Sequence, residues 1–168
     1  MRRGAEDVSY HGNTLAYYEP DNVILVSAAQ DSNDNFVGKC YIYEIESDAW
    51  AGYFDISGGN VCVDESDKKF YVAGGRLFNK GRLMQYDGPG GSLTNDLNLA
   101  TVNASNPYVV DAINNAFYQG CTVHNNVLYQ LYWKKYSMII AYNATTGEYI
   151  KHWNLPHFSN LCKVIDEY

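Results

Sequence analysis

Apolar and small residues alternate with polar residues over short stretches of this chain, and turn-forming residues separate the stretches. Leu15 and Tyr17 show this pattern, as do Val61 and Val63. A period of two places successive side chains on opposite faces of a β-strand. Helical periodicity is not sustained along the sequence, and only one short helical turn is expected, at 111–118. The chain is therefore predicted to be all-β.

The predicted strands form three groups of four, joined by short polar turns. Asn, Asp and Gly suit such turns because they bond their own backbone or adopt positive φ angles. The predicted strands are 13–17, 23–27, 39–45 and 50–56, then 60–63, 70–73, 82–86 and 93–99, and finally 120–123, 127–131, 138–142 and 149–155.

Tyr43, Tyr86 and Tyr142 mark the same position in each group. Each tyrosine stands seven residues before a large apolar residue and thirteen before an aliphatic one. The equivalent residues are Trp50, Leu93 and Tyr149, and Ile56, Leu99 and Leu155. An internal repeat near this length, made of strands, predicts a β-propeller-like fold with four-stranded antiparallel blades.

This reading gives a single propeller-like domain, or a partial propeller, over 1–168. The three repeats lie at about 13–56, 60–99 and 120–155, and an insertion at 100–119 separates the second from the third. A fourth repeat starts at 160–168, with one extra strand at 160–165. Three repeats do not close a ring of about 4–8 blades. Open sheet edges and bare blade faces favour association. We therefore expect a homo-oligomer, such as a dimer with six blades, or part of a longer chain.

The third repeat carries motifs of a known propeller type. Gln119-Gly120 begins its inner strand, Leu128-Tyr129 lies in its second strand, and Tyr142 begins a Y-[DN]-x-x-[TS]-G-E turn. Such blades resemble those of NHL-like propellers and of propeller domains in bacteriophage tail receptor-binding proteins. The second repeat departs from the pattern at 87–91. The resemblance implies a fold that hosts many functions. The similarity to phage tail proteins favours an extracellular or virion-associated location over a cytoplasmic one.

A formal net charge of −7 narrows the choice of partner. A nucleic-acid binder needs clustered Lys and Arg, so no nucleic-acid partner is expected. No apolar run is long enough to span a bilayer, so membrane insertion is not expected either. Arg2 and Arg3 are followed by no hydrophobic stretch, and a secretory signal is not predicted.

The predicted ligand-binding face is the one that carries the loops between second and third strands and the loops after fourth strands. Aromatic rings there can stack on sugars, and lysines can meet anionic groups. The candidate ligand-binding residues are Tyr132, Trp133, Lys134, Lys135, Tyr136, Arg76, Asn79 and Asp111. The alternative is that these aromatic residues pack on a neighbouring blade. The insertion at 100–119 is expected either to join the site or to cover an edge.

Metal, cofactor and catalytic signatures are not found in the sequence. The segment 31–35 superficially resembles a calcium loop, but Phe36 and Ile42 stand where an EF-hand has Gly and Glu. The four histidines are dispersed, and the four cysteines, Cys40, Cys62, Cys121 and Cys162, form no C-x-x-C pair. Free thiols are favoured over disulfides, with Cys121 and Cys162 at matching repeat positions.

The sequence thus predicts a non-catalytic recognition module that binds a cell-surface glycan or a protein, such as a phage receptor-binding or adhesin domain. One alternative is a fragment of a propeller-family carbohydrate-active enzyme, a glycoside hydrolase or lyase, in which Asp111 is the first carboxylate to inspect. The other is a protein–protein interaction scaffold.

Overall fold

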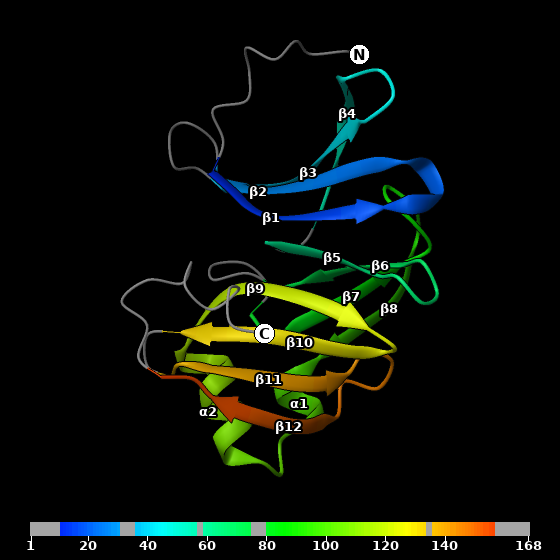
Figure 1. Ribbon diagram of the computed structural model, residues 1–168. Helices are drawn as coiled ribbons and strands as arrows, with labels where there is room; N and C mark the ends of the chain where they lie inside the picture. The colour runs from blue at the N-terminus through cyan, green and yellow to red at the C-terminus, as the bar shows by residue number, and fades with distance from the viewer. Residues whose placement is uncertain (1–10, 31–35, 57–58, 75–79, 134–135, 157–168) are drawn as a thin grey trace.

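The computed structural model describes residues 11–30, 36–56, 59–74, 80–133 and 136–156. Strands dominate it, and they stack as successive four-stranded units (Figure 1). The strands are β1 His11–Tyr18, β2 Val23–Gln30, β3 Phe36–Glu44, β4 Ala49–Asp55, β5 Asn60–Asp64, β6 Lys69–Ala73, β7 Arg82–Tyr86, β8 Leu93–Asn98, β9 Phe117–His124, β10 Val127–Trp133, β11 Met138–Asn143 and β12 Tyr149–Asn154.

Each unit of four consecutive strands is antiparallel, and we call β1–β4 blade 1, β5–β8 blade 2 and β9–β12 blade 3. Blade 1 is a separate sheet. Blades 2 and 3 are joined because their first strands, β5 and β9, run parallel, with Asp64 opposite Val123. The prediction of an all-β fold built from four-stranded antiparallel blades is confirmed. The extra strand expected at 160–165 lies outside the described residues.

The repeated tyrosines occupy one structural position. Tyr43 pairs with Trp50, Tyr86 with Leu93, and Tyr142 with Tyr149, each between the third and fourth strands of its blade. The register shifts immediately before each tyrosine. A bulge at the same place in every blade explains why the spacing of seven residues recurs in the sequence.

Two cores fill the spaces between the blades. Alternate residues of β6 divide between them: Phe70 and Val72 face blade 1, whereas Tyr71 and Ala73 face blade 3. Both faces of blade 2 are therefore buried, which accounts for the burial of β5 along its whole length. The second core extends onto the insertion, through residues such as Ile113.

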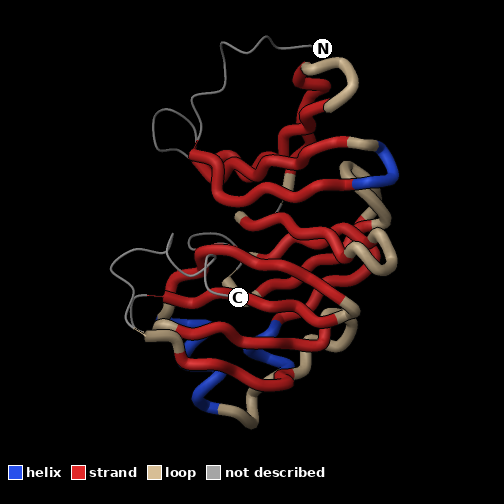
Figure 2. The backbone as a smooth tube through the Cα atoms, viewed as in Figure 1, coloured by secondary structure: helices blue, strands red, loops and turns tan. Residues whose placement is uncertain are grey.

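The insertion is more helical than the sequence suggested. It contains α1, Leu99–Val102, and α2, Pro107–Asn115, and Figure 2 shows both at the end of the molecule that holds blade 3. Asn106 caps α2 by accepting a hydrogen bond from Val109 N, and Pro107 suits the first turn. The predicted helical turn extends to 118, but α2 ends at Asn115 and β9 begins at Phe117. In the described ranges, no helix is long and apolar enough to cross a membrane.

Candidate functional site: an acidic groove and an aromatic cluster

The structure describes only some of the residues predicted to bind a ligand. One of them, Tyr132, does not reach the surface. Its side chain is fully buried, and its hydroxyl shares a 2.8 Å hydrogen bond with that of Tyr142. β10 continues as far as Trp133, so its alternation turns Leu128 and Tyr132 toward blade 2. A strand that ends at 131, as the sequence predicts, leaves Tyr132 in a loop, whereas the observed longer strand makes it a core residue. Arg76, Asn79, Lys134 and Lys135 lie outside the described residues.

The structure brings two other predicted residues together. The Tyr136 hydroxyl donates a hydrogen bond to Asp111 on α2, and Asn115 Nδ2 donates another to Asp111 at 2.6 Å. The Tyr136 ring lies 5.7 Å from that of Tyr108, which lies 4.9 Å from the ring of His152. We call Tyr108, Asp111, Tyr136 and His152 the aromatic cluster. The Asp111 carboxylate thus connects Tyr136 with α2 through these hydrogen bonds.

Among the predicted residues that the structure describes, Trp133 offers the most surface. Its side chain is 39% exposed, and its ring lies 5.6 Å from that of Phe117, its partner across β9 and β10. It follows buried Tyr132 directly, so strand alternation alone places it on the outside of blade 3.

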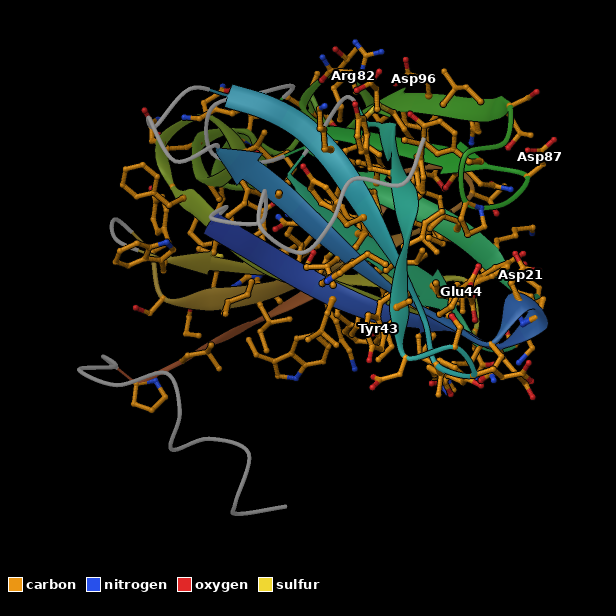
Figure 3. All side chains as sticks on the ribbon, turned by 90° about the horizontal axis from the view of Figure 1, so that it is seen from above. Asp21, Tyr43, Glu44, Arg82, Asp87 and Asp96 are labelled. Carbon is orange, nitrogen blue, oxygen red and sulfur yellow. The ribbon has the colours of Figure 1, made fainter. Side chains whose placement is uncertain are left out.

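A groove of about 520 Å³ lies at turns that the sequence analysis did not select. It is formed by the first and third turns of blade 1 and the third turn of blade 2. The residues that line this acidic groove are Asp21, Asn22, Val23, Ile42, Glu44, Glu46, Ser47, Ala51 and Pro89. Asp21 and Glu44 lie at the same end of the molecule in Figure 3, with Asp87 on the same side.

Local backbone structure sets the groove wall on blade 1. The short helix η2, Glu19–Asp21, begins with Pro20 in its first turn and ends at Asn22, which has a left-handed φ of 52°. Asn22 Oδ1 accepts a 3.1 Å hydrogen bond from the Tyr17 hydroxyl. Ser47 Oγ donates to the Glu44 carboxylate at 2.7 Å. These contacts hold Asp21 and Glu44 at the groove.

The turn of blade 2 closes the other side. Ser92 N donates to the Asp87 carboxylate at 2.6 Å, which folds the turn and presents Pro89 to the groove. Gly90, with a φ of +74°, lies against the ring of Phe54 on β4. The turn therefore rests on blade 1, and the groove spans two blades.

The electrostatics of the groove are negative. The lining includes three carboxylates and no basic residue. Burial raises the pKa of Tyr18, and the nearby charges of Asp21 and Asp87 raise it further. The ion pairs seen among the described residues, Lys68–Glu19, Lys69–Asp67 and Arg82–Asp96, do not involve a lining carboxylate.

The groove is suited to cationic and apolar groups. In the part of the chain that the structure describes, no three His, Cys, Asp or Glu side chains are grouped to hold an ion. Val23 and Ile42 add apolar surface between the carboxylates. The sequence carried one signal that could have found the site, the concentration of Glu and Asp at 19–21 and 44–48.

No protein-family profile and no curated protein matches the sequence. Solved structures do match the fold. The structure of U3-55K has a TM-score of 0.54 at 9% identity, over 91% of this chain and 42% of that one. The crystal structure of the RRP9 WD40 repeats gives 0.54 at 10% identity, over 91% and 41%. Apo AztD from Citrobacter koseri gives 0.50 at 16% identity, over 92% and 38%.

These likenesses show a β-propeller fold. The chain spans about two fifths of the length of the structures it matches. The expected propeller is thereby confirmed, while the resemblance to NHL-like blades and to phage tail propellers stays a prediction.

Proposed function

We propose that this chain is a protein-recognition module that binds a basic segment of its partner in the acidic groove. The observation that carries the proposal is the groove itself, a volume of about 520 Å³ that three carboxylates and several apolar residues line together. That volume lies within the range of about 300–1,000 Å³ that is usual for ligand sites. The WD40 repeats among the structural matches agree with the propeller scaffold that such a module needs.

Lysine and arginine match both properties of the groove. Their charged ends can meet carboxylates while their aliphatic stems lie on apolar surface such as that of Ile42. An exposed ion pair contributes only about 0.2–1 kcal/mol. Several pairs must therefore act together, and binding should weaken as salt screens them.

The test begins with peptides selected from a displayed random library against the full chain. We expect Lys or Arg next to apolar residues in the selected peptides. Replacing two lining carboxylates, Glu44→Gln with Glu46→Gln, should weaken binding about 3- to 10-fold by fluorescence anisotropy.

A matched control removes the same charge elsewhere. Glu148 accepts a hydrogen bond from Thr146 Oγ1 at 3.0 Å, much as Glu44 accepts one from Ser47, and Asp55 is exposed on β4. Glu148→Gln with Asp55→Asn should leave binding unchanged. Equal losses in both double variants, or selected peptides without basic residues, would reject the groove as the site.

A second candidate function is glycan binding through Trp133, favoured by the exposure of its ring on blade 3. This role would fit the adhesin or phage receptor-binding domain, extracellular or virion-associated, that the sequence resemblance implied. On a glycan array, Trp133→Ala should abolish binding while Trp153→Ala, a tryptophan of similar exposure on β12, retains it. Absence of binding, or equal effects of the two variants, would count against this candidate.

We also propose that blade 1 is covered by another blade, in a homo-oligomer or a longer chain. Leu15 on β1 is 73% exposed, although Val61, which occupies the equivalent position in blade 2, packs against blade 1.

A further inference from the structure

Two cysteines meet at the interface of blades 2 and 3. Cys62 lies on β5 and Cys121 on β9, and their Sγ atoms are 3.1 Å apart. Both are free thiols. They are 59 residues apart in the chain, so it is the stacking of the blades that brings them together.

The register of the two strands explains this contact. β5 and β9 run parallel with Asp64 opposite Val123. Cys62 and Cys121 each precede those residues by two positions, which places them opposite each other on the same face. Neighbouring strands lie about 4.7–4.9 Å apart, a separation within the Cα range of about 4.4–6.8 Å that disulfides span.

The thiols form the middle of a row of side chains that crosses four strands. Tyr71 on β6 is opposite Cys62, and Gln130 on β10 is opposite Cys121. Among the described residues, Tyr71 OH and Gln130 Nε2 have no hydrogen-bond partner.

The two thiols differ in access to solvent. Cys62 is buried, whereas Cys121 is partly exposed. The hydrogen bond from Cys121, together with burial, raises the pKa of the Cys62 thiol. Because the thiolate is the reactive form and must be reached by the reagent, Cys121 is the residue that reacts first.

We propose that Cys62 and Cys121 form an oxidative modification site that reacts with a small disulfide such as oxidised glutathione and closes into a disulfide between blades 2 and 3. The Cys121 thiolate attacks one sulfur of the small disulfide, whose S–S bond breaks, and the departing thiolate takes up a proton. Cys62 then loses its proton, and its Sγ attacks Cys121 Sγ. The mixed disulfide breaks and a second small thiol leaves. Two protein thiols are oxidised, and one small disulfide is reduced to two thiols.

The new bond would close a long loop that contains most of blade 2 and the helical insertion. Such a closure restricts the unfolded chain more than the folded one. We expect oxidation to raise Tm by about 5–10 °C.

The test uses the full chain with Cys162→Ser, since that cysteine lies outside the described residues. The reduced protein is incubated with oxidised glutathione and analysed by intact mass, peptide mapping and thermal unfolding. We expect the loss of two hydrogens, a Cys62–Cys121 cross-linked peptide, and reversal by dithiothreitol.

Single variants separate the roles of the thiols. Cys62→Ser should stop at a mixed disulfide on Cys121, and Cys121→Ser should leave Cys62 unmodified. Cys40→Ser is the matched control, because Cys40 is fully buried and burial raises its pKa to about 12; this variant should still form the bond. A stable mixed disulfide on Cys121 with Cys62 present, a bond that forms only in urea, or a bond to Cys40 would overturn the proposal.

Discussion

The carboxylate of Asp64 is fully buried where blades 2 and 3 meet. Asn125 N and Asn126 N of blade 3 donate to it at 3.3 and 2.8 Å, and Ser66 donates through N and Oγ at 3.0 and 2.6 Å. Burial alone would raise the pKa of Asp64, but these hydrogen bonds outweigh it and hold the pKa below its ordinary value. One side chain thus fixes the turn of its own blade and the turn of the next.

We predict that Asp64→Asn lowers the free energy of unfolding by about 1–3 kcal/mol, because an amide NH₂ faces backbone donors that lose their acceptor. Glu65→Gln, an exposed neighbour, should change it by less than about 0.5 kcal/mol. Urea titrations measure both. Similar midpoints for the two variants would show that Asp64 does not join the blades.

The pH dependence of stability follows from the same residue. A pKa that is lower in the folded state contributes stability above the unfolded pKa, which is about 3.9. That contribution is lost as pH falls through the lower, folded pKa. Unfolding at a series of pH values should therefore show a loss below about pH 4, which is smaller in Asp64→Asn. Equal acid sensitivity of the wild-type protein and the variant would contradict this assignment.

At the residue scale, sequence patterns locate some of the residues that meet in the aromatic cluster and not others, for a physical reason. Tyr136 and Asp111 were both selected, and they meet although 25 residues separate them. Tyr132 was selected as a surface residue because the end of β10 could not be located from composition. Tyr108 and His152 were not selected, since neither belongs to a local motif.

At the element scale, Asn103 attaches the insertion to blade 3. Its Nδ2 donates to Leu99 O at 2.8 Å and to Gly147 O at 2.9 Å, while its Oδ1 accepts from Tyr149 N at 2.8 Å. The side chain is buried. The link between α1 and α2 is thereby fixed to the turn between β11 and β12.

We predict that Asn103→Ala destabilises the protein by about 2–3 kcal/mol, because three hydrogen bonds are lost and Gly147 O and Tyr149 N stay buried without them. Amides of α2 should also exchange faster with deuterium. The control is Asn114→Ala, an exposed position on α2. If hydrogen exchange in α2 is the same in both variants, Asn103 does not anchor the insertion.

Strands were easier to predict than helices in this chain. The strands are located to within a few residues by two local features of the sequence. These are the period-two alternation and the repeated tyrosine that follows the bulge in each blade. α2 is short, and its buried face consists of Val109, Ala112 and Ile113. In a segment rich in Asn, three such residues give little periodic signal, although Asn106-Pro107 is a recognisable helix start.

At the scale of the whole molecule, blade 1 presents an apolar face in two rows. The cross-strand pairs place Leu15, Val26, Tyr41 and Tyr53 in one row and Tyr17, Ile24, Tyr43 and Trp50 in the other. Val61, Val63, Phe70 and Val72 hold equivalent positions in blade 2, and they pack on blade 1. The face of blade 1 that these two rows define therefore has the composition of a blade-packing surface. Leu15 and Tyr53 on it are exposed, whereas Tyr41 is buried.

We predict that the chain associates through this face, because exposed Leu15 and Tyr53 would then be buried. Sedimentation should give a dimer for the wild-type chain and a monomer for Leu15→Lys with Tyr53→Lys. Leu93→Lys, at a Leu of 50% exposure on β8, is the control and should remain dimeric. A wild-type monomer that melts sharply would contradict association between copies.

The acidic groove belongs to this scale too. The concentration of Glu and Asp at 19–21 and 44–48 is a sequence signal for two of its turns, but not for the assembly of the turns into a groove. Its walls come from turns of two blades, and Asp21 and Pro89 are brought together by the stacking of the sheets. A pattern confined to one segment carries no information on such a contact.

Backbone NMR of the full chain, titrated with a selected basic peptide, tests whether the proposed partner binds in the acidic groove. We expect the largest chemical-shift changes at 21–23 and 44–47, with β12 unaffected. Shifts concentrated instead at Tyr108, Tyr136 and His152 would place the partner on the aromatic cluster and contradict the proposal.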